Sequence, residues 1–291
     1  MNLNKFYSKL TAKQAAFIAV FFWATNYPAT KYALVHTDVN TLAVLRYTIA
    51  GVILFFLGIK KNIPLPKLSE IPKFFFVGFI GFSAYFVIFN IAMTKITSST
   101  ASVINALTPA LTALLAFFIF KEKIRALGWF SLFISFIGVT IMTLWNGVLS
   151  VNNGIFIVLF AYLMLSIYNI CQRGLSKKYS SFQIIIYSMI LGSIQLLVYS
   201  PKSLLKIAHL DLSVLLVIIY MAVFPAVVSY MLWTRAFEIA KSTTEVTTFM
   251  FCSPILTAII SAITIGEIPD ISTFIGGAIV ISGMILFSKT K

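Results

Sequence analysis

The chain has 291 residues, of which 60% are hydrophobic and only 10% are charged, and its net charge is +14. A soluble domain of this length carries about 25% charged residues, so the composition excludes an ordinary water-soluble protein and indicates a lipid bilayer as the partner. The basic residues form no basic stripe with interleaved aromatics, so they do not indicate nucleic-acid binding. In a membrane protein they indicate topology.

Ten apolar segments follow one another along the chain, each close to the roughly 20 residues that a membrane-spanning helix needs. Their predicted limits are 14–35, 40–59, 72–93, 97–120, 126–145, 153–173, 181–200, 212–234, 243–265 and 271–288. The first segment follows three lysines and has no small-residue cleavage site after it, so we expect a retained span and not a signal peptide. The connections are short, so we expect no separate soluble domain.

The basic residues of the connections predict the orientation of the chain. With a cytoplasmic N-terminus and ten spans, sixteen Lys and Arg residues fall on the cytoplasmic side and three, Lys95, Lys202 and Lys206, fall outside. Cytoplasmic connections carry an excess of Lys and Arg, so this asymmetry predicts that both termini are cytoplasmic.

Two stretches 145 residues apart are nearly the same: TPALTALLAFFIFKEKIRALG at 108–128 and SPILTAIISAITIGEIPDIST at 253–273. The same offset aligns Glu122 with Glu267 and Gly138 with Gly283, and an offset of 142 aligns Lys31 with Arg173. These matches predict two halves of five spans.

We place the halves at residues 1–147 and 148–291. Because five is odd, the second half crosses the membrane in the opposite sense. This explains why only the first copy has basic residues around its glutamate. Inverted repeats recur in secondary transporters, with the binding site between the halves. The predicted fold is therefore an all-α integral membrane protein with ten transmembrane helices, arranged as two inverted five-helix repeats around a central cavity.

The segment WATNYPATK at 23–31, the Leu45–Arg46 pair and the repeated Pro, Leu-Thr-Ala, Glu and Gly pattern resemble the EamA-type branch of the drug/metabolite transporter superfamily. The resemblance implies a ten-span carrier of the bacterial cytoplasmic (inner) membrane. Family members usually export amino acids or small metabolites. It also implies a cavity lined mainly by spans 1, 3, 4, 6, 8 and 9, but it identifies no substrate.

Pro109 and Pro254 fall inside apolar segments, where proline removes a backbone donor. Thr112 and Thr257 follow them closely and are placed to satisfy freed carbonyls. We expect these four residues to form helix kinks. The kinks either bend during gating or are static.

Charged side chains inside a span are costly and are therefore functional candidates. Arg46 and Lys31 are candidate anchors for a substrate anion. The alternatives are an arginine that snorkels or caps carbonyls, and a lysine that snorkels or pairs with Asp38. Arg235 and Glu238 are three residues apart and are expected to pair.

The eight acids and both histidines lie near segment ends, which disfavours a proton-coupled drug antiporter and favours a facilitator or exchanger. Catalytic motifs are absent, so we expect no enzyme, cofactor or metal. The two cysteines, Cys171 and Cys252, are interpreted as packing residues. Small residues, among them Gly138 and Gly276, share one face of two segments and predict close helix packing. Monomer and homodimer both remain open.

Several side chains combine an apolar body or an amide with hydrogen-bonding atoms in segments expected to line the cavity, as small-molecule sites require. With the two cations, the predicted substrate-binding residues are Trp23, Asn26, Lys31, Arg46, Tyr85, Asn90, Asn105, Tyr162, Asn169, Tyr230 and Trp233. For any one of them, helix packing is the alternative role. The predicted function is secondary transport of amino acids or related small metabolites by an exporter or facilitator. The alternative is import or exchange of an anionic or phosphorylated metabolite.

Overall fold

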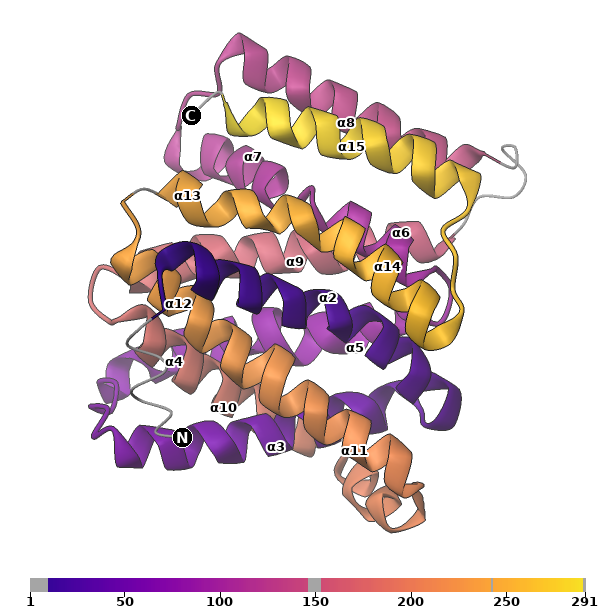
Figure 1. The fold of residues 1–291 in the computed structure, drawn as a ribbon. Helices are drawn as coiled ribbons and strands as arrows, with labels where there is room; N and C mark the ends of the chain where they lie inside the picture. The colour runs from indigo at the N-terminus through magenta and orange to yellow at the C-terminus, as the bar shows by residue number, and fades with distance from the viewer. Residues whose placement is uncertain (1–9, 146–152, 242, 290–291) are drawn as a thin grey trace.

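The computed structural model describes residues 10–145, 153–241 and 243–289. Every regular element in these ranges is helical (Figure 1). In chain order the elements are α2 (Ala12–His36), α3 (Val39–Lys60), η1 (Leu68–Glu70), α4 (Ile71–Gly78), η2 (Phe79–Ser83), α5 (Ala84–Met93), α6 (Ser98–Asn105), α7 (Thr108–Phe120), α8 (Ala126–Leu144), α9 (Asn153–Leu175), α10 (Ser181–Tyr199), η4 (Pro201–His209), α11 (Leu212–Met221), η5 (Ala222–Val228), α12 (Ser229–Ile239), α13 (Thr243–Thr247), η6 (Thr248–Cys252), α14 (Ser253–Ile265) and α15 (Ile271–Ser288). The predicted all-α membrane class agrees with this architecture. The proposed boundary between residues 147 and 148 lies outside the described ranges, as do Lys5, Lys9 and Lys291.

Nine helical segments within the described ranges are long and apolar enough to cross a bilayer. Each coincides with a predicted segment; 97–120, for example, corresponds to Ser98–Phe120. The first predicted span corresponds to α2, which has 25 residues but is not among the nine. Asn26, Thr30 and Lys31 lower the mean hydropathy of α2, and Asn26 and Thr30 are buried inside the protein.

Two of the long helical segments contain a π-helical turn at mid-length. Between α4 and α5 this turn is η2, and between α11 and α12 it is η5, which contains Pro225. Such turns occur often at functional sites because they widen the helix and redirect its side chains.

The two repeated prolines begin helices and do not kink them. Pro109 lies in the first turn of α7 and Pro254 in the first turn of α14. A proline is tolerated there because its missing N–H has no partner within the helix in any case. The expected kinks within a helix are therefore corrected: the α-helix is interrupted immediately before α7 and before α14.

The ends of α7 and α14 have the same local structure, 145 residues apart. Each helix has 13 residues and ends in a left-handed residue, Lys121 with φ 56° and Gly266 with φ 67°. In each case the following glutamate donates its backbone N–H back into the helix, from Glu122 to the Ala116 carbonyl and from Glu267 to Ser261.

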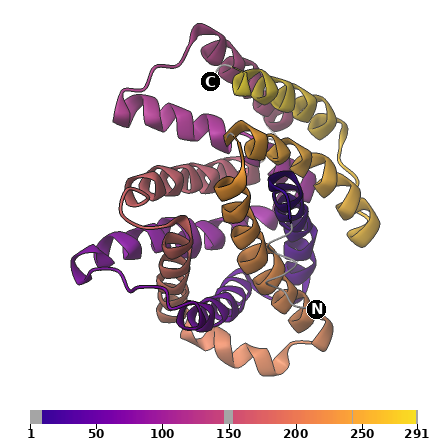
Figure 2. The same cartoon turned by 60° about the vertical axis from the view of Figure 1, so that its left-hand side comes forward.

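The packing repeats in the same way. Helix α9 packs against α5 and α7, as α2 packs against α12 and α14. Figure 2 shows the same helices from a second direction. Helices α2 and α9 therefore have neighbours that lie at equivalent positions along the chain.

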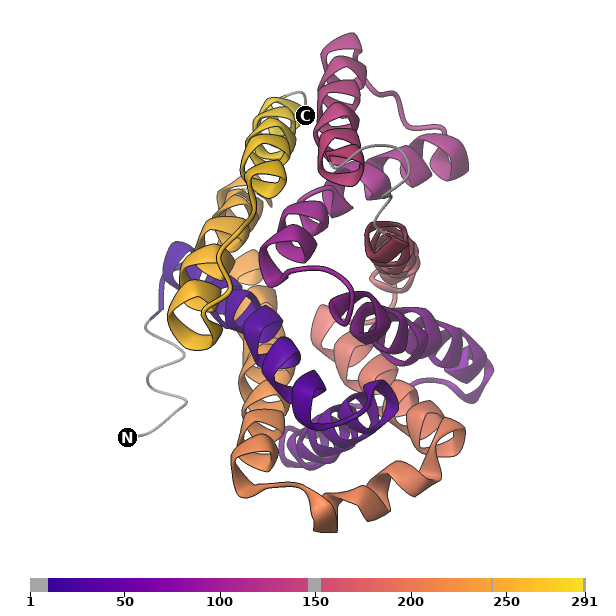
Figure 3. The ribbon, with the colours of Figure 1, turned by 90° about the vertical axis from the view of Figure 1, so that its right-hand side faces the viewer.

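Helices α8 and α15 pack together at one edge of the molecule (Figures 1 and 3). A Cβ on Gly138 would lie 2.6 Å from the Gly276 carbonyl oxygen, and a Cβ on Gly283 would collide with Ser135. Ser131 and Ser135 are fully buried on the same face. The predicted close packing of small residues is confirmed.

The ion pairs at the helix ends correct one expectation. Arg235 and Glu238 pair at 3.7 Å, as predicted. Lys31 lies 3.9 Å from Glu267, whereas Asp38, the partner considered for Lys31, pairs with Lys206 at 2.7 Å. The turn geometry after α14 brings Glu267 to Lys31, and Asp38 is held in place as the N-cap of α3.

Candidate functional site

A cavity of about 540 Å³ lies between helices from the first part of the chain, α2 to α7, and helices from the second part, α9 to α14. Its walls come from α2, α5, α6, α7, α9, α12 and the start of α14, with further residues from α3, α10 and the α13–η6 region. Eight of the predicted substrate-binding residues line it: Trp23, Asn26, Arg46, Tyr85, Asn105, Asn169, Tyr230 and Trp233. Pro109 and Thr112 also line it. Whether any of these residues contacts a substrate stays a prediction.

Two helices present regular stripes to this cavity. The stripe on α9 contains Leu165, Tyr168, Asn169 and Gln172, and the stripe on α12 contains Tyr230, Trp233, Thr234 and Phe237. Both follow the i, i+3, i+4, i+7 spacing of a single helix face. Helix α2 contributes Trp23, Asn26 and Tyr27, which occupy the first three positions of the same spacing.

Trp23 is the centre of an aromatic wall. Its ring centroid lies 5.4 Å from that of Tyr230 and 5.1 Å from that of Trp233, both edge to face. Its indole Nε1 donates a 3.0 Å hydrogen bond to the carbonyl of Pro225 in η5. This bond fixes the ring while it satisfies a carbonyl of the π-helical turn. The wall therefore offers rigid apolar surface to a ligand.

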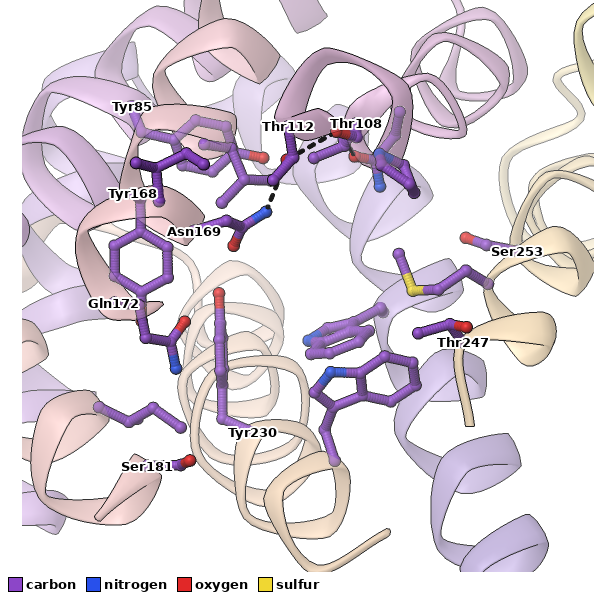
Figure 4. A pocket seen from close by; sticks show the side chains of 18 of the residues that line it. Tyr85, Thr108, Thr112, Tyr168, Asn169, Gln172, Ser181, Tyr230, Thr247 and Ser253 are labelled. Carbon is purple, nitrogen blue, oxygen red and sulfur yellow. Dashed lines mark hydrogen bonds between the residues drawn. The ribbon is translucent and has the colours of Figure 1, made fainter. Parts of the chain in front are cut away.

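The opposite wall is polar and its side chains are joined by hydrogen bonds of 2.8–3.4 Å (Figure 4). Asn169 Nδ2 donates to Thr112 Oγ1 at 3.4 Å, and Thr112 Oγ1 donates to the Thr108 carbonyl at 2.8 Å. Thr108 Oγ1 donates to Asn105 Oδ1 at 2.9 Å. The amides and hydroxyls are thus oriented by one another before any ligand arrives.

Arg46 carries a charge with no acid opposite it. The residue is only 3% exposed, and its guanidinium carbon lies 4.7 Å from the Phe86 ring centroid and 5.1 Å from that of Tyr47. Its Nε atom is buried and has no hydrogen-bond partner among the described residues. The acid among the described lining residues is Glu122, which pairs with Arg173 at 2.6 Å. A buried, unpaired guanidinium is suited to bind an anionic group of a ligand.

Five predicted residues lie outside the cavity lining. Lys31 faces Glu267, Asn90 donates to the Val39 carbonyl at 3.2 Å, and Tyr162 donates to the Ala101 carbonyl at 2.9 Å. Thr257 donates to the Ala24 carbonyl of α2 at 3.4 Å, and Pro254, three residues earlier in α14, is also buried. The side chains that can form hydrogen bonds therefore interact with other parts of the protein and not with the cavity: Lys31, Asn90, Tyr162 and Thr257.

Sequence reasoning missed several lining residues, notably Tyr168, Gln172, Tyr27 and Thr247. The first two share the helix face of Asn169, one and three positions away, so the helical period carried a usable signal. Tyr27 directly follows Asn26 on the face that begins at Trp23. Thr247 is the last residue of α13, a helix of five residues that is too short to show a helical period.

A second hollow of about 560 Å³ lies between α4 and α9. Its charged residues are Glu70, Lys73 and Lys178, and both lysines pair with the glutamate at 2.7 and 2.9 Å. Its charges are therefore largely satisfied within the protein. Both cysteines of the chain are free thiols, and Cys171 borders this hollow.

Known proteins resemble this chain over nearly its whole length. A family model described as "EamA-like transporter family" matches residues 11–144 and 152–289. "Uncharacterized transporter YdfC" of Bacillus subtilis (strain 168) is 27% identical over 268 residues, covering 92% of this chain and 87% of that protein. "Probable terminal-alkyne amino-acid exporter" of Streptantibioticus cattleyicolor is 23% identical, covering 94% and 92%. A crystal structure of a protein 15% identical to this chain shares its fold with a TM-score of 0.64, covering 95% of this chain and 96% of that one.

Proposed function

Because the chain belongs to the EamA-like transporter family and is a multi-pass membrane protein, we propose that it is a secondary transporter that moves amino acids or related small metabolites, acting as an exporter or facilitator. Membership in a transporter family implies that the chain is not an enzyme. The observation that carries the proposal is the 540 Å³ cavity, which combines an aromatic wall, an oriented polar wall and an unpaired guanidinium. An amino acid has complementary parts: an apolar side chain, a hydrogen-bonding amine and a carboxylate.

Transport proceeds by alternating access between two inverted repeats, 1–147 and 148–291, and α2, the first span, brings the number of spans to ten. Three observations support this arrangement. The two halves share the turn geometry after α7 and α14, exchanged helix neighbours and π-helical turns at equivalent places. The family model also matches one segment in each half. The sequence asymmetry of basic residues supports cytoplasmic termini. The relatives from Bacillus subtilis and Streptantibioticus cattleyicolor support a location in the bacterial cytoplasmic membrane.

A second function rests on Arg46 alone. Import or exchange of an anionic or phosphorylated metabolite would use the Arg46 guanidinium as the anion anchor. Lys31, the second anchor considered from the sequence, lies outside the cavity beside Glu267, which reduces support for this alternative. The relative named as an amino-acid exporter supports the first function.

The test is solute flux with purified protein in proteoliposomes, using a panel of amino acids, sugars and phosphorylated metabolites. Ala113→Trp would fill the cavity from α7, and Ile119→Trp, at a 56% exposed position of the same helix, is the matched control. We expect flux of at least one amino acid, lost with Ala113→Trp and kept with Ile119→Trp. Equal flux in both variants, or no flux of any solute, would refute the proposal. The same preparation gives the oligomeric state, for which monomer and homodimer are the proposed alternatives.

A further inference from the structure

Two repeat-related ion pairs lie at opposite ends of the cavity helices. Glu122, which follows α7, pairs with Arg173 of α9 at 2.6 Å. Glu267, which follows α14, lies 3.9 Å from Lys31 of α2. The two glutamates are 145 residues apart and the two cations 142 apart, so each pair joins equivalent elements of the two halves. Their opposite positions follow from the inverted orientation of the halves.

The cavity reaches one of these pairs and stops short of the other. Both Glu122 and Arg173 line it, and their side chains are 45% and 57% exposed. Lys31 and Glu267 are not among the lining residues, and their side chains are only 24% and 17% exposed. The molecule is therefore open at the Glu122 end and closed at the Glu267 end.

The cavity stripes show the same difference residue by residue. An offset of 142 maps Trp23, Asn26 and Tyr27 of α2 onto Leu165, Tyr168 and Asn169 of α9, and all six line the cavity. The next pair departs from this equivalence, because Gln172 lines the cavity whereas Thr30 is fully buried.

Helices α7 and α14 show the same difference between the open and the closed end. On α7 the lining continues from Thr108 through Thr112 to Ala116, whereas on α14 it ends at Ser253. Thr257, the equivalent of Thr112, is fully buried against α2. Helices α2 and α14 are thus in contact at positions where the equivalent positions of α9 and α7 line the cavity.

Glu267 also holds the closed end by a second bond. Its Oε2 accepts a 2.9 Å hydrogen bond from the backbone N–H of Ser98 at the start of α6. One carboxylate therefore joins α2, α6 and the α14–α15 connection. Ser102, one turn further along α6, is 1% exposed, whereas its equivalent 145 residues later, Thr247, lines the open cavity.

We propose that Lys31–Glu267 is the outer gate of the transporter, closed in this conformation, and that Glu122–Arg173 is the equivalent inner gate at the open mouth. This inference rests on the alternating-access transport and the cytoplasmic orientation proposed above. In the outward-facing state the roles exchange: the contact between α2 and α14 opens, and the contact between α9 and α7 closes and buries the Glu122–Arg173 pair. The four charged residues are then positioning residues that set the balance between two states, and they need not contact the substrate.

The test measures access and needs no transported solute. Cys171 and Cys252 are replaced by Ser, and a single reporter, Ser102→Cys or Thr247→Cys, is introduced. A membrane-impermeant thiol reagent is added to right-side-out or inverted membrane vesicles. We expect the Thr247→Cys thiol to react from the cytoplasmic side and the Ser102→Cys thiol to be protected. Glu267→Gln should accelerate labelling at position 102 from outside by about fivefold or more, within the usual range of conformational coupling.

The repeat supplies the matched control. Glu122→Gln removes the equivalent charge from the inner pair and should not accelerate labelling at position 102. The exchanged pair, Lys31→Glu with Glu267→Lys, should restore part of the protection, because it re-forms the ion pair but a lysine at position 267 cannot accept the Ser98 N–H bond. Partial restoration separates a lost ion pair from a damaged fold. Unchanged labelling with Glu267→Gln, equal acceleration with Glu122→Gln, or failure of the exchanged pair to restore any protection would overturn the gate assignment. A labelling shift without flux of any panel solute would leave the gate assignment standing and refute the proposed substrate class.

Discussion

Replacement of Arg46 by Gln removes the one cavity charge that has no partner among the described residues. Gln keeps a hydrogen-bonding head of similar reach, so the substitution tests charge more than volume. If Arg46 holds a substrate carboxylate, the variant loses a charge-assisted hydrogen bond, which contributes about 1.5–3 kcal/mol. The half-saturating concentration of the substrate should therefore rise about 10- to 150-fold.

The effect of Arg46→Gln on stability should be small or favourable. The two ring contacts at 4.7 and 5.1 Å are lost, and cation–π contacts contribute about 0.5–2 kcal/mol. Against this, the folded protein no longer holds an unpaired charge that is 3% exposed, and removing such a charge recovers several kcal/mol of desolvation free energy.

The assay combines flux in proteoliposomes with thermal unfolding in detergent. Arg235→Gln is the matched control, because Arg235 pairs with Glu238 and does not line the cavity. We expect a large change in half-saturating concentration for Arg46→Gln only, partly recovered by Arg46→Lys, with the melting temperature preserved. If Arg46→Gln lowered the melting temperature and left the half-saturating concentration unchanged, Arg46 would be a packing residue and the anion-anchor reasoning would be refuted.

Three further predictions follow from other parts of the molecule. Gly138→Ala should destabilise the α8–α15 contact by about 1–3 kcal/mol because its Cβ would lie 2.6 Å from a backbone oxygen; Gly174→Ala, with no atom within 4 Å, should not lower the melting temperature. Partial burial alone would raise the pKa of Asp38, but hydrogen bonds from Lys206 and Thr41 lower it from 3.8 to about 2. The stabilisation from this carboxylate should therefore be complete above pH 3.8 and lost as the pH falls toward 2, so the difference in melting temperature between wild type and Asp38→Asn should be constant from pH 7 to 5. Asp38→Ala should cost about 1 kcal/mol more than Asp38→Asn, which keeps the N-cap; equal losses would contradict the capping role. Trp23→Phe should weaken substrate binding more than it lowers the melting temperature, since it frees a bonded cavity carbonyl, and binding by tryptophan fluorescence quenching, which retains Trp233 as reporter, checks this.

The helices were predictable because a spanning segment is specified by composition over about 20 residues, and each apolar run meets that requirement alone. The direction in which a polar side chain points was not predictable for every residue. Asn90 lies in the same helix as Tyr85, yet it faces the start of α3 while Tyr85 lines the cavity. That difference depends on the rotation of α5 against its neighbours, and rotation is set by contacts between distant segments.

The charged residues show the same limit. The identity of Glu122 and Glu267 as repeat equivalents was visible in the sequence, but their partners were not. Lys31 was expected to bind an anion, to snorkel or to pair with Asp38, and its neighbour is a glutamate 236 positions away along the chain. The repeat aligns Lys31 with Arg173 and Glu267 with Glu122. Either ion pair could therefore have been predicted from the other, because equivalent cations are expected to contact equivalent acids.

The left-handed residue after α7 has a consequence for how the protein is made. The equivalent position after α14 is Gly266, which adopts this conformation freely, whereas Lys121 adopts it at a cost of about 1–2 kcal/mol. In the proposed orientation, a glycine at position 121 would relieve that cost but remove one positive charge from a cytoplasmic connection. Under that orientation, the lysine at position 121 adds to the positive charge that directs insertion, at the expense of local backbone stability.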